Sequence, residues 1–225
     1  MTRPVLHRIA RLARVVALVG LTGTAAAAQP RSAADGAYGR FDGDLDIGLS
    51  LGAELAPETR RASARLSMHY FWMAGLAVGY ADALGSDQRP ERDLSVGVDL
   101  RPLFIPRWSN DLTRGPALLD LTLDSLSLGA GGFWAQPQDG DFGSERGFVA
   151  SAGIGIPLLA RARGPWFEAR AVARWPSRSG DPSPRAEGSA LILIGWHELV
   201  QTGIARRAEW RPTRRHGHAE RRAAW

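Results

Sequence analysis

The 225-residue sequence predicts an all-β fold, an antiparallel up-and-down barrel of about eight strands. Three observations predict it. Apolar and polar residues alternate with a period of two, which is the pattern of strands with two different faces. Each alternating segment is about ten residues long, close to the length of a strand in a membrane barrel. Stretches rich in Gly, Pro, Asp and Ser separate the segments, and these residue types favour turns. No long helical pattern is present, and only 106–115 is compatible with a short turn of helix.

The first segment has the three-part pattern of a secretory signal peptide. Residues 1–14 contain four Arg and no acid, 15–21 form an unbroken apolar run, and small residues suited to cleavage follow. The apolar run is shorter than the roughly 20 residues of a membrane-spanning helix. An Arg-rich mitochondrial transit peptide would lack such a compact run. We expect residues 1–28 to direct export and residues 29–39 to form a linker to the barrel domain, 40–200.

The first four strands are expected at 40–56, 61–70, 75–80 and 93–101. The segment 56–59, Ala-Pro-Glu-Thr, is the expected tight turn between the first two. Because a turn sets the register of a hairpin, it places Glu54 opposite Arg61, Ser50 opposite Arg65 and Asp46 opposite His69. These pairs are oppositely charged or able to form hydrogen bonds on one face.

The fifth strand is expected to begin at Leu119, because Leu119, Leu121 and Leu123 alternate with polar residues. The phase of the alternation reverses near 124–125, as it does where a β-bulge inserts one residue. Three further strands are expected at 148–158, 167–175 and 190–196. The expected longer connections are 85–92, 106–116, 136–146 and 176–188.

Alternation alone does not tell whether the apolar face points into a soluble barrel or outward into lipid. Segments of about ten residues match the length that a tilted strand needs to cross a bilayer. An even number of strands allows the sheet to close, and closure removes edges that lipid cannot solvate. Aromatic residues gather near strand ends, as in the girdles at lipid interfaces. The residues assigned to this girdle are Tyr70, Trp72, Tyr80, Trp134, Trp166, Trp175 and Trp196.

On these features, most of 40–200 resembles the small eight-stranded outer-membrane β-barrels of Gram-negative bacteria. The resemblance is architectural and rests on periodicity. It implies a location in the outer membrane, contact with outer-membrane lipid and with the barrel assembly machinery, and both termini in the periplasm. The connections 85–92, 136–146 and 176–188 would then face outward. A soluble periplasmic barrel that holds an apolar ligand remains an alternative.

The polar strand faces carry acids and arginines that can neutralise one another. An eight-stranded barrel is just wide enough inside for side chains to fill it. We therefore predict a plugged lumen without an open pore, and a structural or surface-interaction role. The residues assigned to this lumen network are Asp42, Asp44, Asp46, Glu54, Arg61, Arg65, Asp99, Arg101, Glu168, Arg170 and Arg174.

Ser67 and His69 lie two residues apart on one strand face with acids nearby, the minimum for a Ser/His/acid hydrolase. Because some outer-membrane barrels are lipid-modifying hydrolases, such an enzyme using Ser67 and His69 is the alternative function. No Gly-x-Ser-x-Gly motif is present, and nothing in the sequence marks an oxyanion hole. Two hydrogen-bonded lumen residues are the favoured interpretation. His197, next to Trp196, is expected at a lipid interface.

Asp42-x-Asp44-x-Asp46 resembles the opening of a calcium loop, but Ile47 and Ala53 stand where that loop needs Gly and Glu. The chain has no Cys, which excludes thiolate metal sites and disulfides. Nothing resembles a phosphate-binding loop. We expect neither a metal nor a cofactor.

The basic character of the chain is confined to its ends. The net charge is +5, but residues 29–203 carry 17 Arg against 21 acids. The segment 204–225 holds seven Arg against Glu209 and Glu220. A basic chain ordinarily suggests nucleic acid, but this distribution predicts no nucleic-acid partner. The tail, 201–225, is expected to be disordered, with binding of anionic lipid headgroups as the alternative. The sequence does not indicate the oligomeric state.

Overall fold

The computed structural model describes residues 39–40, 42–57, 59–83, 92–110, 112, 116–137, 140–177 and 186–204. The predicted signal peptide lies outside these residues. So do the predicted linker apart from Gly39 and the predicted tail beyond Ile204.

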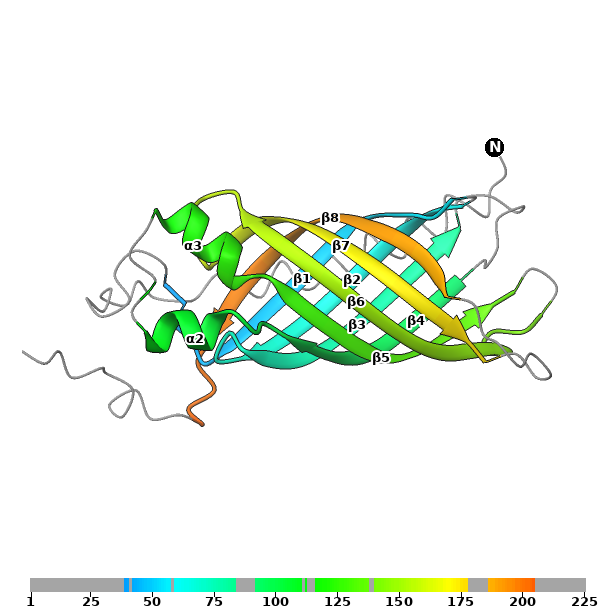
Figure 1. Cartoon of the computed structure of the whole chain (residues 1–225), viewed down its shortest axis with the longest axis horizontal. Helices are drawn as coiled ribbons and strands as arrows, with labels where there is room; N and C mark the ends of the chain where they lie inside the picture. Colours follow the sequence, from blue (N-terminus) through cyan, green and yellow to red (C-terminus); the bar gives the residue numbers. More distant parts are fainter. Residues whose placement is uncertain are drawn as a thin grey trace, which may run out of the picture. The chain divides into compact units, whose positions relative to one another are not determined.

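The barrel domain is a closed antiparallel sheet in which each strand pairs with its neighbours in sequence and β1 also pairs with β8 (Figure 1). The prediction of an eight-stranded antiparallel barrel is therefore confirmed. The strands are β1 (Leu45–Leu55), β2 (Arg60–Tyr70), β3 (Ala74–Ala83), β4 (Arg92–Leu100), β5 (Ser127–Gln136), β6 (Glu145–Pro157), β7 (Gly164–Pro176) and β8 (Glu187–Val200).

The β1–β2 hairpin has the predicted register. Glu54 lies opposite Arg61, Ser50 opposite Arg65 and Asp46 opposite His69. A backbone hydrogen bond from Ala56 to Thr59 closes the turn, with 2.9 Å between its nitrogen and oxygen. The short turn fixes the pairing over the whole hairpin.

Two helices separate β4 from β5, and they correct the prediction of a fifth strand from Leu119. They are α2 (Phe104–Ser109) and α3 (Ala117–Asp124). In a helix of 3.6 residues per turn, Asp120 and Asp124 lie on one face, and both bind Arg107. The predicted β-bulge is also wrong, because the change of phase marks the end of α3 and the start of β5.

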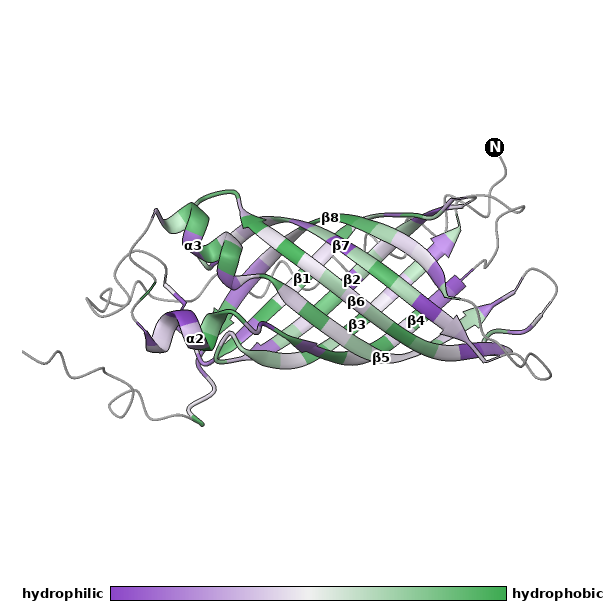
Figure 2. Cartoon of the chain, in the orientation of Figure 1, coloured by the Kyte–Doolittle hydropathy of each residue, from purple (hydrophilic) through white to green (hydrophobic). Residues whose placement is uncertain are grey.

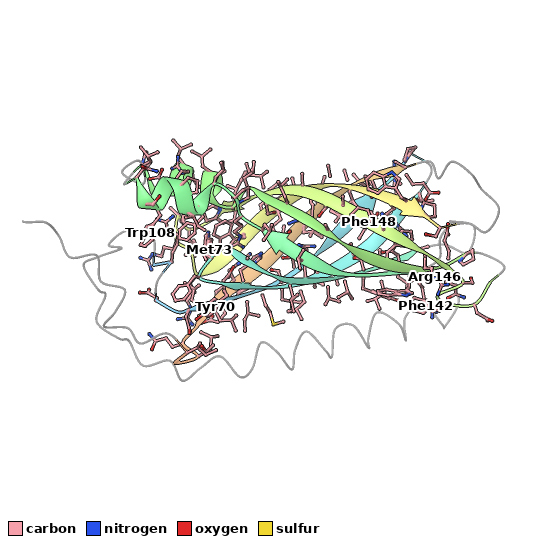
Figure 3. The ribbon with its side chains drawn as sticks, turned by 60° about the horizontal axis from the view of Figure 1, so that its bottom comes forward. Tyr70, Met73, Trp108, Phe142, Arg146 and Phe148 are labelled. Atoms are coloured by element: carbon pink, nitrogen blue, oxygen red, sulfur yellow. The ribbon has the colours of Figure 1, made fainter. Side chains whose placement is uncertain are left out.

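The barrel has two different ends. The helices, the turns 71–73 and 158–163, the start of β1 and the end of β8 lie at one, which we call the helix end. The β1–β2 turn, the ends of β3, β5 and β7 and the starts of β4, β6 and β8 lie at the other, the loop end. Figure 3 shows Tyr70, Met73 and Trp108 at the helix end, and Phe142, Arg146 and Phe148 at the loop end. No helix among the described residues is long and apolar enough to cross a membrane.

The wall of the barrel is polar inside and apolar outside, and hydrophilic and hydrophobic residues alternate along its strands (Figure 2). Successive side chains of a strand point to opposite faces. Buried charged residues such as Asp46, Asp99 and Arg170 therefore alternate with exposed apolar ones. The exposed apolar side chains of the strands include Leu51, Leu66, Leu76, Val96, Val98, Leu128, Phe148, Ile154, Ile192 and Ile194.

The larger apolar core cluster lies at the helix end rather than in the middle of the barrel. It contains Trp72, Phe104, Leu121, Ala162 and Trp166, and we call this cluster the aromatic plug. Both tryptophans are 1% exposed, so their assignment to an outer aromatic girdle is wrong. Trp166 lies on β7 in phase with the inward-facing Arg170. Trp72 lies in the β2–β3 turn with φ of 61°.

An inward glycine makes room for the plug. A Cβ atom built on Gly155 of β6 would lie 2.9 Å from Cε3 of Trp166. We expect Gly155→Ala to lower the free energy of unfolding by about 1–3 kcal/mol, because overpacking forces neighbours from their positions. The measurement is denaturant unfolding in phospholipid vesicles. Gly188→Ala is the control, because a Cβ there meets nothing within 4 Å. Equal stability of the two variants would contradict the tight packing of Trp166.

Candidate functional site

The interior of the barrel is the candidate functional site, because buried charged side chains fill it in successive layers. The layer nearest the loop end holds Glu54, Arg61, Asp93 and Arg174. Nη2 of Arg61 lies 2.9 Å from Oε1 of Glu54, and Arg174 pairs with the same carboxylate. Nε of Arg174 is 3.1 Å from Oδ2 of Asp93. This layer joins four strands, β1, β2, β4 and β7, across the lumen.

Asp99 organises the middle layer. Nη2 of Arg170 donates to both of its carboxylate oxygens at 2.9 and 3.0 Å. Nη2 of Arg65 lies 3.3 Å away. Arg170 also donates to the hydroxyls of Ser127 at 2.6 Å and Ser151 at 2.9 Å. A buried carboxylate with charged donors on several sides holds β2, β4 and β7 together.

Asp46 occupies the corresponding place in the layer nearest the helix end. Nδ1 of His197 lies 2.8 Å from Oδ1 of Asp46, and Nη1 of Arg101 lies 3.0 Å from Oδ2. His69 links this layer to the middle one, since its Nε2 is 3.1 Å from Asp99 and its Nδ1 is 3.5 Å from Asp46. The middle layer and the layer nearest the helix end therefore form one connected network along the lumen.

Glu168 joins the network from β7. Its carboxylate accepts a hydrogen bond from Ser50, and its Oε1 lies 3.7 Å from Nε2 of His197. The two assigned acids that precede β1 lie differently. Asp44 is buried and bonds to Thr202. Asp42 is exposed and lies outside the strands, so its assignment to the lumen network is wrong.

The aromatic plug adjoins the last charged layer. The guanidinium carbon of Arg101 lies 4.1 Å from the centre of the Trp72 ring, within the range of a cation–π contact. The Trp166 ring is 5.0 Å from His197 and 5.7 Å from Trp72, measured between centroids. Phe71 and Trp72 both have positive φ, which is unusual for bulky residues. This backbone turns the Trp72 ring into the barrel.

A further ion cluster lies between the helices. Arg107 of α2 binds Asp120 and Asp124 of α3, and Arg40 binds the other carboxylate oxygen of Asp124. Burial raises the pKa of the Asp124 carboxyl above its usual value, and the positive charges of Arg40 and Arg107 oppose that shift. The helices are therefore attached to the chain segment that enters the barrel.

Cavities inside the barrel are small, whereas its loop end is open. A cavity of about 50 Å³ borders Arg65, Asp99, Arg170 and Arg174, and one of about 20 Å³ lies between His69 and Trp166. The loop end holds a vestibule of about 1150 Å³. Arg61, Asp93 and Arg174 form part of its lining.

Ser67 and His69 both lie on β2 and face inward. Both ring nitrogens of His69 face carboxylates, those of Asp99 and Asp46. Within the described residues, no hydrogen bond joins Ser67 to His69, and no group of three or more His, Asp or Glu has the geometry of a metal site. The observed role of His69 is to bridge two buried acids.

Sequence reasoning missed His197 as a lumen residue and placed it at a lipid interface. It is 3% exposed and contacts Asp46. The available signal was its position, in phase with the inward Leu193. The plug residues Phe104 and Leu121 carried no comparable signal, because their direction depends on how α2 and α3 fold back over the barrel.

The comparisons with known proteins give a likeness of structure and none of sequence. No protein-family profile matches the chain, and a search of curated proteins finds no match. Among solved structures, the chain is similar to the crystal structure of the N-terminal β-barrel domain of Pseudomonas aeruginosa OprF. The TM-score is 0.45 and the sequence identity is 9%, over 68% of this chain and 97% of that chain.

Proposed function

We propose that this chain is a β-barrel of the outer-membrane type, located in the outer membrane of a Gram-negative bacterium. Its lumen is plugged, and its role is structural or in surface interaction. The observation that carries the proposal is the inverted barrel wall, with charged residues inside and apolar residues outside.

The outer face of the barrel supports the proposal that the strands contact lipid. Leu76, Val98 and Ile194 are each at least half exposed, and large exposed apolar side chains occur on β1 to β6 and on β8. Soluble monomers rarely expose continuous apolar patches larger than a few hundred Å². In a bilayer these apolar side chains contact lipid rather than water. The closed barrel also pairs its backbone hydrogen-bonding groups there, because the sheet has no open edge.

Residues near the loop end support a membrane–water interface at that end of the barrel. Asp82, Arg92 and Arg146 occupy outward positions at the ends of their strands. Aromatic residues lie next to them on the outer face, closer to the middle of the barrel. The hydroxyl of Tyr80 donates to Asp82 at 3.0 Å. The Phe148 and Trp175 rings are 5.6 Å apart. This order, polar rim followed by aromatic residues and then aliphatic belt, is that of a membrane barrel.

The charged layers and the aromatic plug support a closed lumen. Arg170 and Arg174 of β7 reach across the interior to Asp99 and Asp93 of β4. The cavities of about 50 and 20 Å³ have room for a few isolated waters at most. An apolar ligand is disfavoured there, because it would have to displace paired charges. Both termini would lie on the periplasmic side, with the vestibule facing outward.

Reconstitution of the full chain tests the membrane assignment and the plug separately. We expect the protein to float with phospholipid vesicles after alkaline carbonate washing, because its belt is buried in lipid. We also expect no discrete conductance steps in planar bilayers, where an open porin serves as the positive control. Protein that remains in the carbonate supernatant would contradict the membrane assignment. Regular conductance steps would contradict the plug.

A further inference from the structure

The helix α3 buries its charged side chains and exposes apolar ones, as the barrel wall does. Asp120 and Asp124 are 3% and 0% exposed, whereas Leu118 and Leu119 are 48% and 53% exposed. On a helix of 3.6 residues per turn, the two leucines fall on one side and the two aspartates on the other. A helix that lies in water has the opposite arrangement, with its apolar face toward the protein and its charges outside.

Contacts on the inner face fix this orientation. Asp120 and Asp124 bind Arg107, and Asp124 also binds Arg40. Leu121, on the same side, is completely buried in the aromatic plug. Rotating α3 to hide Leu118 and Leu119 would break these ion pairs and withdraw Leu121 from the plug. The exposed leucines are therefore a fixed feature of the fold.

The exposed face of α3 adjoins the outer face of the barrel. The helix packs against β6, and Ser125, directly after it, exchanges hydrogen bonds with the backbone of Gly155. On β6, the outward Ile154 and Ile156 are followed by Leu158 and Leu159, which are 55% and 61% exposed. In Figure 2, α3 carries both hydrophobic and hydrophilic residues and lies beside the end of β6.

Charged residues border this apolar surface. Arg161 and Arg163 are exposed and follow Leu158 and Leu159 in the β6–β7 turn. Arg163 pairs with Glu198 of β8, with 2.9 Å between Nη2 and Oε1. Leucines beside arginines are suited to a lipid interface, where apolar side chains enter the acyl region and guanidinium groups meet phosphate headgroups.

We propose that α3 and the β6–β7 turn (158–163) form an interfacial anchor in the bilayer leaflet nearest the helix end. Leu118, Leu119, Leu158 and Leu159 enter the acyl boundary, while Arg161 binds lipid phosphate. This inference rests on the proposed membrane location of the barrel. The lipid assignment follows from the continuity of the leucines with the outer face of β6.

Single-cysteine variants test the anchor cleanly, because the chain has no native Cys. Leu119→Cys carries a spin label in vesicles of phosphatidylethanolamine and phosphatidylglycerol. Leu51→Cys on the barrel belt is the lipid reference, and Asp141→Cys at the loop end is the water reference. Two relaxation agents report the environment of the label: oxygen concentrates in the acyl region, whereas a water-soluble nickel chelate stays in water. We expect the ratio of oxygen to nickel relaxation at position 119 to exceed that at 141 and approach that at 51.

Each other outcome has a distinct meaning. A lipid signal at 51 with a water signal at 119 would overturn the anchor and leave the proposed function standing. Water signals at both positions would overturn the proposed function. Broadened spectra at 119 that sharpen on dilution with unlabelled protein, together with disulfide-linked dimers on oxidation, would show that a second copy covers α3, and would also overturn the anchor.

Discussion

Replacing Asp99 with alanine is expected to lower the free energy of unfolding by about 3–5 kcal/mol. Asp99 is 2% exposed and pairs with Arg65 and Arg170, and it also bonds to His69. Its removal leaves the buried guanidinium of Arg170 and the partly buried one of Arg65 without their shared counter-ion, and a buried charge without a partner is strongly destabilising. The measurement is reversible denaturant unfolding in phospholipid vesicles, followed by tryptophan fluorescence.

Two comparisons separate the loss of a buried pair from the loss of any acid. Asp82→Ala removes an acid at the exposed rim, where Arg92 lies 3.9 Å away, and is expected to cost about 0–1 kcal/mol. The double variant Asp99→Leu with Arg170→Leu removes both buried partners and should be more stable than Asp99→Ala alone. If Asp99→Ala cost no more than Asp82→Ala, the lumen network would not stabilise the barrel.

The strand faces could be predicted from the sequence because a barrel wall has only two environments. Along β1, each step of one residue moves the side chain from the interior to the outside, so alternation reports direction directly. The β1–β2 register followed from the tight turn at 56–59. The phase of the alternation on β7 also indicates the direction of Trp166. Trp166 has the same parity as Arg170 on β7, which identifies it as an inward residue.

The elements at the helix end could not be predicted in the same way. In 119–124, leucines alternate with polar residues, and a segment this short fits both a strand and a helix. Trp72 points inward because its backbone adopts positive φ. The sequence does not predict this conformation for a tryptophan. Aromatic residues near strand ends were therefore assigned outward when two of them form the plug.

The partners of the lumen charges depended on how the barrel closes. Glu54 pairs with Arg61 on the adjacent strand, as the hairpin register predicts, but also with Arg174 on β7. Contacts across the lumen depend on the tilt and stagger of the strands, which local patterns do not contain. Sequence reasoning could identify which charges face inward, but not which of them meet.

An arginine in the middle of the apolar belt is the second large perturbation. Leu51 faces outward on β1 and lies between Ala64 of β2 and Ile194 of β8. We expect Leu51→Arg to lower the free energy of unfolding in vesicles by about 2–4 kcal/mol, the cost of an arginine near the bilayer midplane. Leu55→Arg is the matched control at the end of the same strand and face. It is expected to cost about 0–1 kcal/mol, because it lies near the interface.

This pair of variants tests the orientation of the barrel wall most directly. The measurement is the difference in unfolding free energy between Leu51→Arg and Leu55→Arg in phospholipid vesicles. A wall that faces lipid predicts that Leu51→Arg is clearly the less stable variant. A wall that faces water would leave both within about 0.5 kcal/mol of the unmodified protein, as for ordinary surface substitutions, and that result would contradict the proposed membrane barrel.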